Sequence, residues 1–143
     1  MQVAVSAQER NWAMAAHLSA LVVIAGLPFG HVLGPLVVYL VKGRESEFVG
    51  EHARASLNYQ ITLSLFAIVA IVMAAAVTFG FVVPMTSSSD STATSVSLAA
   101  FGIAFGFLVL AVLCVSVVFI VRGTIAASEG RPYTYPFAAR FLR

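Results

Sequence analysis

Charged residues and cysteine are scarce in this sequence, and each scarcity excludes a class of protein or site. Only 10% of its 143 residues are charged and 60% are hydrophobic, whereas roughly 25% of an ordinary soluble domain is charged. A chain this apolar cannot cover itself with polar surface, so we expect its apolar side chains to face lipid. Its one cysteine, Cys114, excludes a disulfide or a thiolate metal cluster within one chain.

The charge balance also excludes some partners. Eight basic and six acidic residues give a net charge of +2, which is too small to neutralise many phosphates, so no nucleic-acid partner is expected. The first twelve residues lack the basic stretch and short apolar core of a cleaved secretory signal. We therefore expect the first apolar segment to be retained.

Four hydrophobic segments predict an all-α, polytopic membrane protein with a short helical hairpin followed by two long transmembrane helices. They form a single membrane domain over residues 1–143, with segments at about 7–27, 31–42, 47–83 including an interfacial start, and 96–128, and with an aromatic and basic cytoplasmic tail at 130–143. At 1.5 Å per residue, the first segment is about 31 Å long, close to the roughly 30 Å of a bilayer core. The second reaches only about 15–18 Å, so it either tilts into a thinned bilayer or is partly re-entrant.

Local signals set the expected ends of these segments. Ser6 and Glu9 have the spacing of a capping box, which predicts a helix start. The glycines and prolines of residues 26–35 predict a turn, and the Ser/Thr-rich residues 86–97 predict a polar loop. Gly130 is expected to follow the last helix as its C′ residue.

The positions of the basic residues predict the topology. All eight lie near the start of the first segment, around the connection between the second and third, or at and beyond the end of the last, and none lies in the other two connections. The positive-inside rule then places both termini and residues 43–58 in the cytoplasm, which makes this a multi-pass protein of the cytoplasmic membrane.

His17 is the one ionisable side chain in the first segment beyond Glu9 and Arg10 at its start. The favoured interpretation is a neutral histidine that fixes helix packing by a hydrogen bond to a group such as Asn58 or Ser64. The alternative is a proton relay or a ligand contact. A metal or haem site is not expected, because the three histidines are not suitably spaced and because His17 and His52 do not obviously lie at matched depth.

The densest polar cluster lies where the third segment enters the membrane. It is either a structural network or a contact surface for a partner, and its candidate residues, with His17, are Glu51, His52, Arg54, Asn58 and Gln60. No catalytic arrangement and no cofactor motif accompanies it, so an enzyme is not expected.

Two further sets of residues have expected structural roles. Gly102 and Gly106 have the spacing of a close helix contact, within the chain or in a dimer. Interfacial anchoring is expected for aromatic residues near the predicted headgroup level, namely Trp12, Tyr133, Tyr135 and Phe137.

Three segments also carry a resemblance: ERNWAMAAHLSAL (9–21), GPLVVYLVKGRESEFVGEHARASLNYQI (34–61) and VVFIVRGTIAASEGRPYTYPFAARFL (117–142). They resemble a family of small bacterial membrane proteins similar to Tic-twenty, a component of the chloroplast inner-envelope protein translocon. The resemblance implies a compact helical membrane domain with signature positions at Trp12, His17, Glu51, His52, Asn58, Gln60, Tyr135 and Pro136.

The expected function follows from this resemblance and from the polar cluster without attached chemistry. It is that of a non-enzymatic accessory or interaction subunit of a membrane assembly, for protein translocation or envelope maintenance. The alternative is a small oligomeric channel or transporter lined by His17, Asn58 and Gln60, which requires oligomers because four segments are too few to enclose a pore. The expected partners are the bilayer and either a membrane protein or further copies of the chain.

Overall fold

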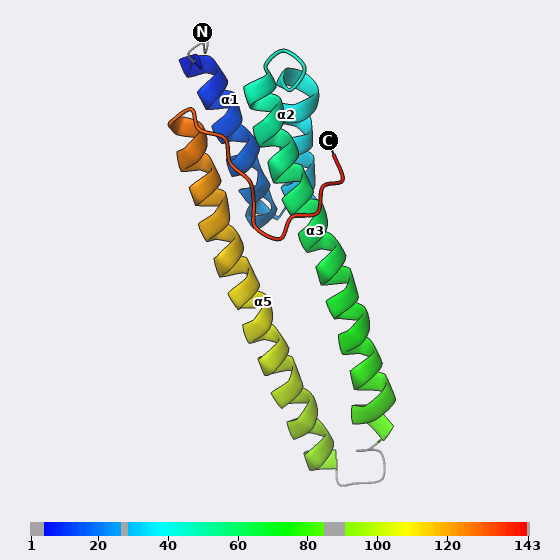
Figure 1. The fold of residues 1–143 in the computed structure, drawn as a ribbon. Coiled ribbons are helices and arrows are strands. Elements are labelled where there is room, and N and C mark those ends of the chain that lie inside the picture. Colours follow the sequence, from blue (N-terminus) through cyan, green and yellow to red (C-terminus); the bar gives the residue numbers. More distant parts are fainter. Residues whose placement is uncertain (1–4, 27–28, 85–90, 143) are drawn as a thin grey trace. The chain divides into compact units, whose positions relative to one another are not determined.

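The structure, a computed structural model, describes residues 5–26, 29–84 and 91–142. The elements in chain order are α1 (Ala7–Leu18), the 3-10 helix η1 (Ser19–Ala25), α2 (Gly30–Lys42), α3 (Glu47–Val77), the π-helical turn η2 (Thr78–Val82) and α5 (Ser91–Ser128) (Figure 1). The described ranges contain helices and no strand, which confirms the all-α fold class.

The chain divides into two compact units, which we describe separately. Unit 1 comprises Met1–Leu63 and Ser116–Arg143, and unit 2 comprises Ser64–Val115. Unit 1 therefore contains α1, η1, α2, the first half of α3 and the end of α5, together with the residues that follow α5.

The start of α1 is the predicted capping box. The Glu9 amide donates to the Ser6 hydroxyl at 3.2 Å, and the Glu9 carboxylate accepts from the Ser6 amide at 2.8 Å. The other Glu9 carboxylate oxygen accepts from the Ser46 hydroxyl at 2.7 Å. Glu9 thus caps its own helix and also ties that helix to the turn before α3.

The first predicted segment is not one α-helix. The α-helix ends at Leu18, and the tighter 3-10 winding of η1 continues to Ala25, while Leu27 lies outside the described residues. At the start of η1 the backbone of α2 comes very close to Ser19. A Cβ on Gly34 of α2 would lie 2.6 Å from both the carbonyl oxygen and the Cβ of Ser19. Gly34 therefore allows α2 to pack closely on the start of η1.

The turn predicted over residues 26–35 is shorter than expected. Gly26 and Phe29 have positive φ angles of 85° and 60°, but α2 begins at Gly30 and contains Pro35. Pro28, the expected helix end, lies outside the described residues. A proline inside a helix loses one backbone hydrogen bond, and here Pro35 is fully buried, so packing offsets that loss.

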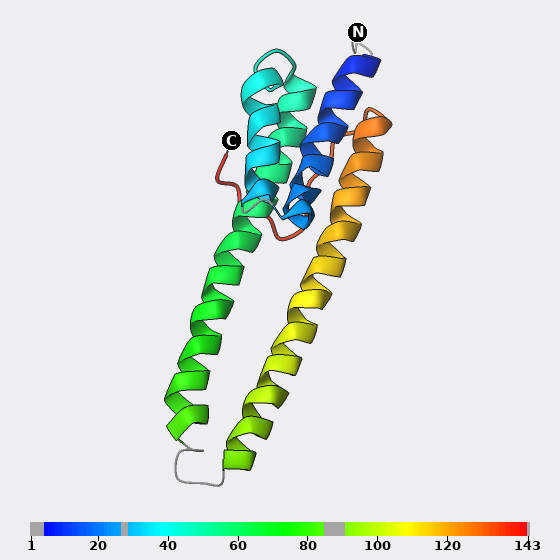
Figure 2. The same ribbon diagram turned by 180° about the vertical axis from the view of Figure 1, so that it is seen from behind.

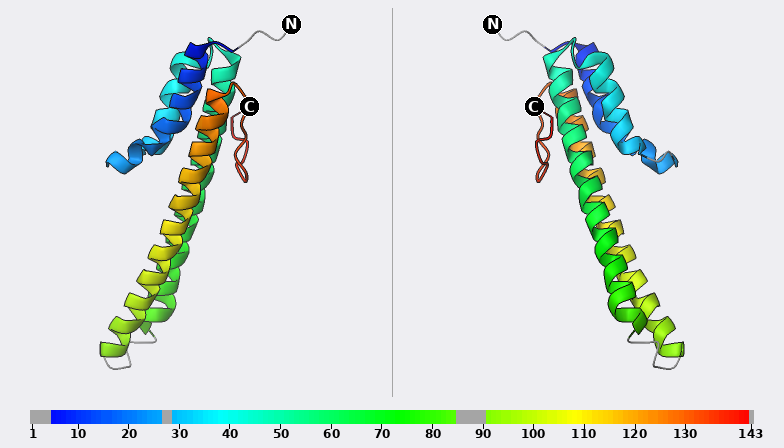
Figure 3. Two further views of the ribbon diagram at one scale, coloured as in Figure 1. Left: turned by 90° about the vertical axis from the view of Figure 1, so that its left-hand side faces the viewer. Right: turned by 90° about the vertical axis from the view of Figure 1, so that its right-hand side faces the viewer.

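The core of unit 1 joins α1, α2 and α3. Small and branched side chains from the three helices meet there, namely Ala16, Val38, Val49 and Ala53. Figure 2 shows α1 and α2 side by side. In unit 1 these two helices lie on one side of α3 and α5, and the tail, residues 131–142, lies on the other side (Figure 3).

Unit 2 consists of the remaining parts of α3 and α5. The helical stretches Glu47–Gly80 and Thr94–Ser128 are long and apolar enough to cross a membrane, and only 6% and 11% of their most apolar windows are buried within the chain. Large side chains such as Phe66, Ile71 and Phe107 are about two-thirds exposed. These helices therefore do not form the buried core of a soluble protein, and their surfaces suit lipid.

The predicted loop over residues 86–97 is helical in its second half. α5 begins at Ser91, and residues 85–90 lie outside the described residues. Residues 91–97 contain no glycine or proline, so nothing in them prevents the helix of the apolar run from extending backward. At the other end, α5 stops at Ser128 as predicted, and Gly130 adopts the expected positive φ of 71°.

Candidate functional site

The buried polar side chains of unit 1 converge on two histidines. His17 lies in the last turn of α1 and His52 near the start of α3, and they are 0% and 1% exposed. His17 Nε2 lies 2.8 Å from His52 Nδ1, and the two rings are nearly perpendicular. The expectation that these histidines do not meet at one depth is therefore wrong.

The tail provides the outer partner of each ring. His52 Nε2 lies 3.1 Å from the Arg131 carbonyl oxygen, and His17 Nδ1 lies 2.8 Å from the Tyr135 hydroxyl. We call this set of His17, His52, Tyr135 and the Arg131 carbonyl the histidine cluster. It joins α1, α3 and the tail, which are far apart in the sequence.

The carbonyl fixes the direction of every hydrogen bond in the histidine cluster. A carbonyl oxygen only accepts, so His52 Nε2 carries the proton, and in a neutral ring its Nδ1 is then an acceptor. His17 Nε2 must donate to that nitrogen, which leaves His17 Nδ1 to accept from the Tyr135 hydroxyl. All donors point from Tyr135 toward Arg131, and both rings use both of their nitrogens.

This arrangement favours a packing role over a proton relay. In the described chain, neither ring hydrogen-bonds to a carboxylate, and an unpaired buried imidazolium is unfavourable. The chain of bonds ends on the Arg131 carbonyl, which can accept a hydrogen bond but has no proton to pass on. His17 is thus hydrogen-bonded as the favoured interpretation expected, although its partners are Tyr135 and His52 rather than Asn58 or Ser64.

Aromatic rings enclose the histidine cluster and keep Tyr135 protonated. Tyr135 stacks on Tyr59 with ring centroids 4.3 Å apart, and Tyr133 meets it edge-on at 5.0 Å. Burial, reinforced by the neighbouring Tyr133, raises the pKa of Tyr135 far above its usual value. Tyr135 therefore remains a hydrogen-bond donor at any physiological pH. It was expected to be an interfacial anchor, but it is 3% exposed because its hydroxyl is bonded inside the protein.

A glycine on α5 makes room for this packing. A Cβ on Gly123 would lie 3.0 Å from His17 Nδ1 and Cε1 and 3.0 Å from a ring carbon of Tyr133, closer than real side chains usually approach. Sequence reasoning missed Gly123, because a glycine near a helix end has no local signal that separates packing from capping. The hydroxyl of Tyr59 on α3 donates to the Ser116 hydroxyl on α5 at 3.1 Å.

Two residues of α3 fasten the far end of the tail. Asn58 Oδ1 accepts from the amides of Phe141 and Leu142 at 3.1 and 2.8 Å, and Asn58 Nδ2 donates to the Leu142 carbonyl at 3.0 Å. The Thr62 hydroxyl oxygen accepts from the Ala139 amide at 3.0 Å. The tail has no helix or strand, so these side chains take the place of secondary structure in satisfying its backbone.

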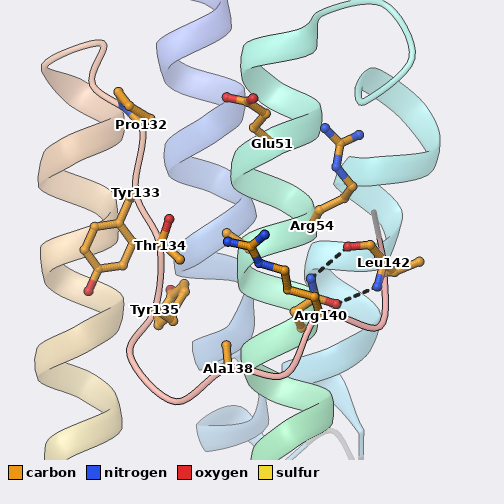
Figure 4. Close-up of a pocket in the computed structure, with 11 residues that line it drawn as sticks. Glu51, Arg54, Pro132, Tyr133, Thr134, Tyr135, Ala138, Arg140 and Leu142 are labelled. Carbon is orange, nitrogen blue, oxygen red and sulfur yellow. Dashed lines mark hydrogen bonds between the residues drawn. The ribbon is translucent and has the colours of Figure 1, made fainter.

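A hollow of about 340 Å³ lies between α3 and the tail (Figure 4). Its lining includes one acidic side chain, Glu51, and two basic ones, Arg54 and Arg140, with Asn58 at the same wall. The residues Glu51, Arg54 and Asn58 share one face of α3, as their spacing predicts.

The remaining predicted site residues are separated. Gln60 is buried in α3, and Trp12 is partly buried against the core of unit 1 instead of standing free at a surface. Phe137 is 91% exposed, which suits an anchor. Gly102 and Gly106 have no described atom within 4 Å of an added Cβ, so the packing role expected for them involves no neighbour in the described chain. Among the described residues no three His, Cys, Asp or Glu side chains are grouped to hold a metal ion.

These features define an all-helical protein with two helices long and apolar enough to cross a membrane and with a pair of buried histidines that the tail closes. The chain belongs to the magnetosome magnetite crystal formation protein family (MamF/MmsF), whose model matches residues 8–142. No curated protein and no solved structure matches the chain.

The family overturns the resemblance to the Tic-twenty-like proteins, and with it the expected function in translocation or envelope maintenance. That resemblance rested on positions that include His17, His52, Asn58 and Tyr135. The structure shows these side chains holding α1, α3 and the tail together.

Proposed function

We propose that this protein acts in magnetite crystal formation as a non-enzymatic integral protein of the magnetosome membrane. The family match carries this proposal, because it extends over residues 8–142 and thus includes both units and the tail. The two long apolar helices, with large side chains exposed from Leu65 onward in α3 and along most of α5, support the membrane location.

The use of the buried polar groups supports a non-enzymatic role. His17, His52 and Tyr135 bond to one another and to a backbone carbonyl, and Asn58 bonds to the tail. A catalytic base or nucleophile needs a free position facing a substrate, whereas both nitrogens of each histidine are already occupied by protein atoms.

Deletion of the gene in cells that form magnetite tests this function. We expect electron microscopy to show membrane vesicles in normal number that contain crystals of altered size or shape, and we expect the wild-type gene to restore them. Unchanged crystal size and shape would refute the proposal. Loss of the vesicles themselves would point to a role in membrane formation instead.

The membrane orientation is proposed from the distribution of basic residues, with both termini in the cytoplasm. In a Cys114→Ala background, Thr92→Cys should react with an impermeant thiol reagent only from the non-cytoplasmic side, and Ser128→Cys only from the cytoplasmic side. Both positions are exposed. The opposite labelling pattern would reverse the orientation.

A further inference from the structure

Two arginines line the hollow from different elements of unit 1. Arg54 comes from α3 and Arg140 from the tail (Figure 4). In the described part of the chain the ion pairs are Lys42 with Glu45 and Arg131 with Glu129, so Arg54 and Arg140 have no carboxylate within 4 Å. With Glu51 as its one acidic side chain, the hollow therefore carries an excess of one positive charge, which favours an anionic ligand.

Hydrogen bonds attach the tail to the helices of unit 1 on both sides of Arg140. On α3, Asn58 binds Phe141 and Leu142, and the Tyr135 hydroxyl is bonded to His17. Arg140 lies on the stretch of tail between these two attachments. The backbone that carries Arg140 is therefore fixed before a ligand arrives, which lowers the entropy lost on binding.

We propose that this hollow binds the phosphate group of an anionic phospholipid headgroup, with Arg54 and Arg140 as its cationic ligands. Arginine presents planar pairs of donors that match phosphate oxygens. Thr134 lines the hollow as well and adds a hydroxyl. The volume of about 340 Å³ is in the range of small-ligand sites and exceeds what a bare phosphate ion fills.

The position along α3 favours a lipid over a free ion. Asn58, at the wall of the hollow, lies seven residues before Leu65, where the long exposed apolar stretch of α3 begins. That separation is about 10 Å of helix, a distance that places the hollow at headgroup level when the apolar stretch is in lipid.

Glu51 narrows the choice of headgroup. Its carboxylate lines the same hollow one helical turn from Arg54, and a carboxylate accepts hydrogen bonds but donates none. A phosphodiester whose headgroup carries a hydroxyl, as in phosphatidylglycerol, satisfies the two arginines and Glu51 together. A quaternary ammonium headgroup has no hydrogen to donate to Glu51.

Titration of the purified full chain in non-ionic detergent tests the site, with binding followed by native mass spectrometry. The probes are short-chain phosphatidylglycerol, phosphatidylcholine of the same chain length, and inorganic phosphate. We expect phosphatidylglycerol to bind most tightly, and Arg54→Gln and Arg140→Gln each to weaken it about tenfold, as expected for loss of one charge-assisted contact. Arg44→Gln is the matched control, because Arg44 is exposed and does not line the hollow.

The outcomes separate the possible ligands. Binding of inorganic phosphate that is as tight as that of the lipid, and that depends on both arginines, would assign the site to free phosphate and overturn the lipid assignment. Equal loss in Arg44→Gln, or lipid binding unchanged in both arginine variants, would overturn the site itself. Arg54→Lys keeps the charge and should bind with intermediate affinity, so it serves if Arg54→Gln does not fold. None of these results depends on whether the protein acts in crystal formation.

Discussion

Replacing Tyr135 by phenylalanine removes one oxygen atom from the histidine cluster and leaves the stacked ring in place. His17 Nδ1 then has no donor, although His17 is 0% exposed and water cannot replace the lost hydroxyl. An unsatisfied buried acceptor costs about 1–3 kcal/mol. We expect the substitution to destabilise the docked state of the tail by this amount, because the lost hydrogen bond joins Tyr135 in the tail to His17 in α1.

Hydrogen exchange measures that docking directly. The amides of Ala139, Phe141 and Leu142 donate to side chains of α3 and are protected only while the tail is docked. A loss of about 1–3 kcal/mol predicts exchange that is about 5 to 150 times faster at these amides. Amides in the middle of α5 should be unaffected.

Tyr133→Phe is the matched control on the same tail. The Tyr133 hydroxyl makes no hydrogen bond in the described structure, and the ring contributes by packing edge-on against Tyr135. Tyr133→Phe should change the free energy of docking the tail by no more than about 0.5 kcal/mol, as for surface substitutions. If the two variants exchange equally, the directed chain of hydrogen bonds derived for the histidine cluster is refuted.

Three other perturbations follow from the same geometry. Gly123→Ala should lower the thermal stability of the protein, because its Cβ would lie 3.0 Å from the His17 ring; Gly102→Ala, which meets no described atom, should leave it unchanged. Asn58→Leu removes three hydrogen bonds to the tail, so limited trypsin digestion should cut at Arg140 much faster than in the wild type, and an unchanged rate would contradict the role of Asn58. Hydrogen bonds from the Ser6 amide, then from the Ser46 and Ser6 hydroxyls, lower the pKa of Glu9. The capping box of Ser6 and Glu9 therefore contributes its full stability above the ordinary pKa of 4.5, and this contribution is lost as the pH falls through the lowered pKa. The fluorescence of Trp12 should report this acid transition, and Glu9→Gln should abolish it.

Local signals in the sequence predict much of the fold. The Ser6 and Glu9 capping box, the end of α5 at Ser128 and the left-handed Gly130 depend on residues at most a few positions apart, and the structure has all three. The lengths of the two long apolar helices follow from composition. Pro35 shows the limit of such signals, because its helix is favoured by burial that only the tertiary structure provides.

The candidate site could be predicted only in part. His17 and Asn58 stand out because polar groups beside apolar runs need partners, but the sequence does not identify those partners. Tyr135 is 118 residues from His17, and no spacing rule operates over that distance. An aromatic and basic tail has the same composition whether it lies at a membrane surface or closes a polar core, so Tyr135 was assigned to the surface.

The contact between His52 and the Arg131 carbonyl has a consequence for biosynthesis. The two residues are 79 positions apart, so α1, α2 and α3 are all made well before the atom that completes their hydrogen bonding. Until residues 131–135 are made, one nitrogen of each of the two imidazole rings lacks its hydrogen-bond partner. A chain that stops before Arg131 therefore retains two unsatisfied polar rings, and such a defect distinguishes unfinished copies from complete ones for the cell's proteases.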